Sequence, residues 1–126
     1  MNEAQQDWIY ELRSGIRTKC TGYMRKTENN QDSYCVLGVA NLVLGGCWEV
    51  FRDRNNATLW RAVISEEVDG FLPREFLDTL GLSTEDELRL YKINDGCTPG
   101  KTRTFAEIAD LLEAYFVDGT PLPEPY

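Results

Sequence analysis

Five basic side chains gather between Leu12 and Thr27, in a segment that contains no acidic residue. They are Arg13, Arg17, Lys19, Arg25 and Lys26, with Tyr23 inside the segment and Tyr34 a short distance after it. Arginine presents a rigid fork of donors that suits phosphate and carboxylate groups, and tyrosine rings stack on bases. These seven residues form a candidate site for an anionic small molecule such as a nucleotide. The alternative is a solvated face that pairs with acidic side chains of the same protein.

The charge of the whole chain points to a different kind of partner. The net charge is −8, so the chain outside the +5 segment carries −13. An acidic surface repels a nucleic-acid backbone and attracts a basic protein. We therefore expect no direct nucleic-acid binding, and we expect a protein partner or a compact anion.

The sequence offers little for catalysis, because it contains no histidine, the commonest general base. Two carboxylate clusters, Glu66-Glu67-Asp69 and Glu85-Asp86-Glu87, have the composition for acid–base work or for holding a divalent metal. Their positions in a predicted loop and at a predicted helix start favour solvated or capping roles. We predict no catalytic residues, and a carboxylate- or metal-dependent enzyme is kept as a second alternative.

Two further motifs resemble cofactor or metal sites without meeting their spacing. The four cysteines are 15, 12 and 50 residues apart, which matches no common zinc pattern. The segment 96–102 has a glycine, three residues, then Gly-Lys-Thr, whereas a phosphate-binding loop needs four residues between its glycines. We predict no metal site and no cofactor, and we interpret 96–102 as a turn.

The surrounding pattern predicts an α+β fold in which helices pack on a small antiparallel hairpin or sheet. Apolar spacing indicates a helix over 3–14, and the apolar run 34–44 favours a buried helix over a central strand. Residues 48–53 and 58–65 alternate like two strands, joined by a turn at Arg54-Asn55-Asn56. We expect Trp48 and Trp60 on this hairpin to pack in the core, or to form an aromatic platform with Tyr23 and Tyr34.

The remaining elements are indicated by caps and turns. Residues 21–26 predict a short strand, 28–32 a loop, and Pro73 the start of a helix that ends at Gly81. Thr84 with Glu87 predicts a capping box and a helix over 85–93, and 94–103 reads as a loop. Thr104 with Glu107 predicts a second capping box. That helix has the core face Phe105, Ile108, Leu111, Leu112 and Tyr115. We expect one domain over 1–118 and an irregular, proline-rich tail over 119–126.

The order of several short motifs resembles a family of small uncharacterised bacteriophage and prophage proteins. The motifs are Trp8 before Leu12-Arg13-Ser14-Gly15, Gly22-Tyr23-Met24-Arg25, Tyr34-Cys35-Val36-Leu37-Gly38-Val39, Leu72-Pro73, Leu80-Gly81-Leu82, Asn94-Asp95 and Thr104-Phe105-Ala106-Glu107-Ile108-Ala109. In that family two adjacent cysteines often precede the Leu-Gly-Val sequence, whereas this chain has Tyr34 before Cys35. The resemblance implies a phage context but no activity and no catalytic residues.

Two functions follow as hypotheses. The first is a phage protein that antagonises a host protein, for example one of host defence, by direct non-catalytic binding. The second is sequestration of a nucleotide or another anionic signal by the basic segment. With no membrane-length apolar run and no signal peptide at the N-terminus, we expect a cytoplasmic protein that does not bind membranes, and a homo-oligomer stays open.

Overall fold

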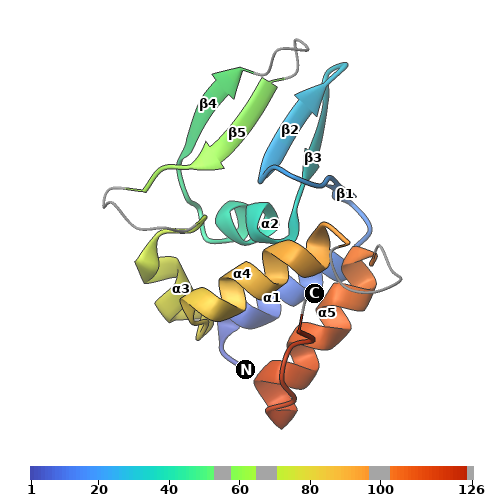
Figure 1. The fold of residues 1–126 in the computed structure, drawn as a ribbon, viewed down its shortest axis with the longest axis vertical. Coiled ribbons are helices and arrows are strands. Elements are labelled where there is room, and N and C mark those ends of the chain that lie inside the picture. Colours follow the sequence, from blue (N-terminus) through green and yellow to red (C-terminus); the bar gives the residue numbers. More distant parts are fainter. Residues whose placement is uncertain (53–57, 65–70, 97–102, 125–126) are drawn as a thin grey trace.

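A five-stranded mixed sheet stands above a group of helices, which confirms the predicted α+β class (Figure 1). The structure is a computed structural model that describes residues 1–52, 58–64, 71–96 and 103–124. Its elements are α1 (Glu3–Arg13), β1 (Thr18–Lys19), β2 (Arg25–Glu28), β3 (Gln31–Tyr34), α2 (Val36–Val43), β4 (Trp48–Arg52), β5 (Thr58–Ala62), α3 (Arg74–Leu80), α4 (Thr84–Asn94), α5 (Phe105–Glu113) and the π-helical turn η1 (Ala114–Asp118). None of the helices in the described residues is long and apolar enough to span a membrane.

Two antiparallel hairpins, β2–β3 and β4–β5, pair through β2 and β5, and β1 adds to β3 in parallel, which gives the order β1-β3-β2-β5-β4. The predicted hairpin is confirmed as β4 and β5, while its turn lies outside the described residues. The predicted loop over 28–32 is wrong, because only Asn29 and Asn30 turn, both at positive φ, and their neighbours are in strands. Asparagine tolerates this left-handed conformation, so a two-residue turn closes the β2–β3 hairpin.

Helix α1 follows the predicted range closely and carries the largest buried ring. Asn2 and Gln5 form a capping box at its start, a cap that the sequence analysis did not predict. The indole N–H of Trp8 donates to the carbonyl oxygen of Val36 at 3.0 Å, and Trp8 is fully buried. This bond ties α1 to the start of α2, because a buried donor must find an acceptor.

Helix α2 occupies most of the apolar run 34–44, as predicted, and lies directly under the strands (Figure 1). Tyr34 itself still belongs to β3. Gly38 lies so close to the β2 side of the sheet that an added Cβ would overlap the carbonyl oxygen of Met24. The absence of a side chain at Gly38 therefore allows α2 to contact the backbone before β2.

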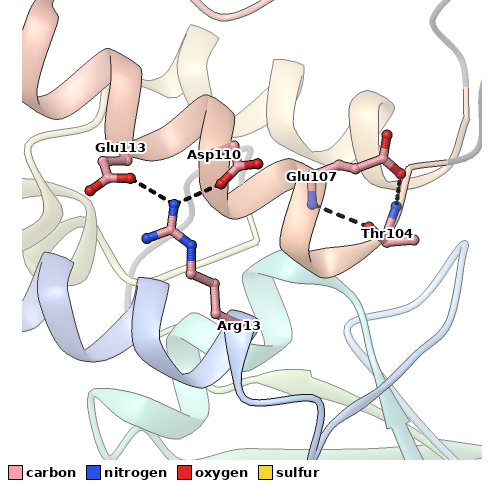
Figure 2. A network of polar contacts seen from close by, with 5 residues as sticks. All are labelled: Arg13, Thr104, Glu107, Asp110 and Glu113. Atoms are coloured by element: carbon pink, nitrogen blue, oxygen red, sulfur yellow. Dashed lines mark hydrogen bonds and ion pairs between the residues drawn. The ribbon is translucent and has the colours of Figure 1, made fainter.

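The C-terminal helices begin at caps, but one cap is shifted from the predicted one. Pro73 precedes α3, and Gly81 ends it in the left-handed conformation, as expected. The capping box of α4 is made by Ser83 and Asp86, so the predicted pair of Thr84 and Glu87 is wrong by one residue. The helix extends through Asn94, which the sequence had placed in a loop. The capping box of Thr104 and Glu107 on α5 is confirmed (Figure 2).

Two buried polar side chains connect the helical layer to the rest of the chain. The Asn94 amide accepts from the Val36 N–H at 3.0 Å and donates to the Cys20 carbonyl at 2.9 Å. The Glu87 carboxylate accepts from the Leu72 N–H at 2.9 Å, and burial raises its pKa above the ordinary value. Both residues satisfy backbone groups that would otherwise be buried without partners.

The chain after α5 packs back onto the core. Residues 119–124 form no helix or strand. Leu122 is nevertheless buried in the core cluster, and Arg89 pairs with Glu124 at 3.1 Å. Of the predicted α5 face, Phe105, Ile108 and Leu112 are buried, whereas Leu111 and Tyr115 are half-buried.

Candidate functional site

The first residue of the predicted anion site, Arg13, points away from the other members. One terminal nitrogen of its guanidinium lies 2.7 Å from an Asp110 oxygen and 2.6 Å from a Glu113 oxygen, both on α5 (Figure 2). These hydrogen bonds, that of Glu113 foremost, raise the pKa of Arg13 above its ordinary value. Arg13 therefore joins α1 to α5.

Arg17, Arg25 and Tyr34 do come together. The guanidinium carbons of Arg17 and Arg25 lie 5.7 Å and 5.6 Å from the centroid of the Tyr34 ring. Each arginine also has a carboxylate partner, Glu11 for Arg17 at 2.9 Å and Asp32 for Arg25 at 2.9 Å. An incoming anion would have to compete with both carboxylates.

Arg25 is enclosed by aromatic rings on one face of the sheet. Its guanidinium carbon lies 4.4 Å from the Trp60 ring centroid and 5.4 Å from that of Trp48, within cation–π range. Its Nε is buried without a hydrogen-bond partner among the described residues. The hydroxyl of Thr27, followed by Arg25, holds the pKa of Asp32 below its ordinary value. Both tryptophans thus pack around an ion pair in the protein.

The other three members of the predicted set are Lys19, Lys26 and Tyr23, and they have different contacts. Lys19 is half-buried on β1, and burial lowers its pKa. Lys26 forms an ion pair with Glu28 at 3.1 Å. Tyr23 packs against Phe51, with ring centroids 6.3 Å apart. Of the seven residues, the structure thus brings Arg17, Arg25 and Tyr34 together.

Several of the carboxylate and cysteine residues that the structure describes cap a helix or lie buried in the protein. Asp86 caps α4 and accepts from the Tyr115 hydroxyl at 2.7 Å. Burial raises the pKa of Cys35 to about 12 and raises that of Cys20, so both thiols are protonated at neutral pH. No group of three or more metal-ligating side chains occurs in the described residues. The cluster at 66–69 and the glycine-rich segment 97–102 lie outside them.

A different site lies between the second face of the sheet and α4. It is a recess of about 270 Å³ whose lining includes the rings of Tyr23, Phe51, Phe71 and Tyr91. Phe71 and Tyr91 stack with their centroids 4.5 Å apart and their planes inclined by 14°. Trp60 also belongs to the lining, but its indole N–H donates to Thr27 at 2.9 Å. Four separated segments thus supply aromatic walls to one recess.

A single charged residue, Arg61, belongs to the described lining of this recess. Its guanidinium carbon lies 5.3 Å from the Phe51 ring centroid, and it pairs with Glu49. The side chains of Arg61 and Glu49 are 62% and 47% exposed, so water screens their attraction. An anionic group of a ligand could therefore replace Glu49 at Arg61 more easily than it could replace a buried carboxylate.

A second hollow lies between α1 and α2. It is a groove of about 410 Å³, and its lining includes Asp7, Glu11, Arg17 and the exposed ring of Tyr10. Leu42 and Val43 of α2 supply its apolar part. Because Arg17 is paired with Glu11, the groove keeps one carboxylate, Asp7, beside an aromatic ring and two aliphatic side chains.

Of the two hollows, the recess shares only Tyr23 with the predicted site. The sequence identified Trp60 and Tyr23 as platform candidates, but it gave no reason to connect them to Phe71, Tyr91 or Arg61. Phe71 and Tyr91 are twenty residues apart and meet because the segment before α3 packs against α4, where the Leu72 N–H donates to Glu87. Comparison of this chain with family models, curated proteins and solved structures found no match.

Proposed function

We propose that this protein is a non-catalytic binding protein that holds a small planar anion in the aromatic recess. The observation that carries the proposal is the set of rings from Tyr23, Phe51, Phe71 and Tyr91 around one hollow. Aromatic side chains stack on flat rings and tolerate different substituents. Arg61 supplies the positive charge that an attached phosphate or carboxylate requires.

The size of the recess limits the ligand. At about 270 Å³ it lies slightly below the range of roughly 300–1,000 Å³ of pockets for drug-sized molecules. This volume suits one or two fused rings with a short charged substituent extending toward the exposed Arg61. A nucleoside monophosphate has this chemistry, in agreement with the nucleotide hypothesis but at a different place from the basic segment.

Thermal denaturation with a small set of probes tests the proposal. The probes are adenosine and guanosine monophosphates, the matching neutral nucleosides, and ribose phosphate, which lacks the ring. A ligand at one hundred times its Kd stabilises by about 2.7 kcal/mol, which raises the Tm by roughly 10 °C for a domain of this size. We expect a rise with the nucleotides and none with ribose phosphate. A Tm that no probe with a ring and an anionic group raises would refute the proposal.

Variants assign the binding to the recess. Arg61→Gln should weaken a nucleotide about tenfold while leaving the neutral nucleoside unchanged, because only the nucleotide uses the charge. Arg89→Gln is the matched control, since Arg89 also pairs with an exposed glutamate but lies outside the recess. Tyr91→Ala should weaken both ligands, whereas Tyr10→Ala should weaken neither. Equal losses in Arg61→Gln and Arg89→Gln would place the binding elsewhere.

The groove between α1 and α2 favours a second candidate function, direct binding of a basic host protein. Tyr10 is 73% exposed in this groove, and Asp7 lies beside it on a chain of net charge −8. Exposed aromatic rings are frequent anchors of protein interfaces. The phage resemblance supplies the host context.

Affinity capture from bacterial extract tests this candidate. A host protein retained in stoichiometric amount by the wild type should be lost in Tyr10→Ala and Asp7→Lys. It should be kept in Glu75→Lys, which reverses an exposed charge on α3 instead. Retention by all four proteins would exclude the groove as the binding surface.

A further inference from the structure

Strand β4 is one edge of the sheet, and part of its backbone points outward. The Val63 N–H donates to the Cys47 carbonyl at 3.1 Å, and the register pairs Trp48 with Ala62. Because backbone groups alternate along an antiparallel ladder, Cys47, Glu49 and Phe51 direct theirs toward β5. Trp48 and Val50 therefore direct their N–H and C=O groups away from the sheet, where no described strand pairs with them.

The two edge strands of the sheet, β1 and β4, differ in how readily another strand could pair with them. Strand β1, at the other edge, has two residues, and such a short strand offers little to a partner. Strand β4 has five residues, without proline or lysine, and the carboxylate of Glu49 is occupied by Arg61. Val50, at the centre of β4, is 50% exposed. Strand β4 therefore has few of the features, such as proline, lysine or a very short length, that keep an edge strand from pairing with another chain.

We propose that β4 is a dimerisation edge and that its partner is a second copy of this chain. Two antiparallel β4 strands with Val50 opposite Val50 share a two-fold axis, so the same groups are used on both sides. In this register the outward groups of Val50 pair with each other, and those of Trp48 pair with residue 52 of the second copy. The contact joins two five-stranded sheets into one of ten strands.

Side-chain chemistry is compatible with this self-pairing. Val50 meets Val50 across the axis, and β-branched pairs stabilise antiparallel neighbours. Glu49 falls opposite Phe51, so no carboxylate faces its own copy. The net charge of −8 disfavours close approach of two copies, and higher salt should therefore strengthen the dimer.

Sedimentation of the intact chain tests the proposal with a variant that removes one hydrogen-bond donor. Val50→Pro deletes an outward N–H and leaves the ladder to β5 intact, since proline is tolerated at edge positions of this kind. We expect the wild type to sediment at twice the mass of one chain and Val50→Pro to sediment as a monomer. Val50→Lys, which places two like charges across the axis, should also be monomeric.

Controls separate this edge from other surfaces. Val63→Lys changes a valine that is 42% exposed but lies after β5, and it should remain dimeric. An unchanged far-ultraviolet circular dichroism spectrum shows that a variant is folded. If Val50→Pro unfolds, the mass of Val50→Lys in sedimentation tests the dimer instead. A wild type that is monomeric at all concentrations would overturn the proposal. This holds also for a monomer that binds extended peptides at β4, and for a dimer that persists in Val50→Lys.

Discussion

Replacing Gly38 by alanine should destabilise this protein, although alanine favours helices. Gly38 lies in the first turn of α2, and an added Cβ would stand 2.8 Å from the carbonyl carbon of Met24 and closer still to its oxygen. The obstructing atoms are backbone, which cannot move aside as a flexible side chain would. The same carbonyl accepts from the Cys35 N–H at 3.0 Å, so a shift of α2 also strains this bond.

The expected magnitude follows from three contributions. Overpacking a core position costs about 1–3 kcal/mol. Disturbing a buried hydrogen bond costs about 1–3 kcal/mol. The higher helix propensity of alanine offsets at most about 1 kcal/mol of this loss in the free energy of unfolding. We therefore expect Gly38→Ala to lower the free energy of unfolding by about 3 kcal/mol, the middle of this balance.

Urea denaturation measures this loss, and Gly15→Ala is the matched control. Gly15 has φ +74°, with no atom near an added Cβ, so alanine there meets only backbone strain of about 1 kcal/mol. The two variants should unfold with similar m-values but different midpoints. The close approach of α2 to the strand region would be refuted by a Gly38→Ala variant as stable as the wild type or more stable than Gly15→Ala.

Two further predictions concern charged groups in the helical layer. Because burial raises the pKa of Glu87 in the folded protein, its protonated form contributes stability that is complete below about pH 4.5 and is lost as pH rises through the folded pKa. Glu87→Gln should therefore lack this fall, so the difference in unfolding free energy between variant and wild type should move in favour of the variant from pH 4 to 7. A difference that is constant over this range would contradict the assigned cause. Arg13→Gln removes the bridge to Asp110 and Glu113, but the partners are exposed, so we expect a loss of only about 0.5 kcal/mol that shrinks in 1 M salt. Thermal unfolding at two salt concentrations measures it, and a loss above 2 kcal/mol would show that Arg13 also supports packing.

Local rules in the sequence determined much of the secondary structure. A capping box joins residues three apart, so Thr104 and Glu107 specify the start of α5 without help from the fold. The same holds for Pro73 before α3 and for the alternation of the β4–β5 hairpin. At the start of α4 the local pattern predicted Thr84 as the cap, whereas Ser83, one residue earlier, caps the helix.

The assembly of the sites was decided by tertiary structure, because their members are far apart in the chain. Arg13 is a residue type that often binds anionic ligands, but here its guanidinium donates a hydrogen bond to Asp110, 97 residues later in the chain. The pairing of Arg13 with Asp110 and Glu113 depends on the packing of α1 on α5, and no local spacing encodes this. Likewise, stacking of Phe71 on Tyr91 depends on how the segment before α3 packs against α4. The sequence by itself therefore determined the elements and the charge that the chain offers to partners. Only the fold determined which of these charges are already paired and which rings surround a hollow.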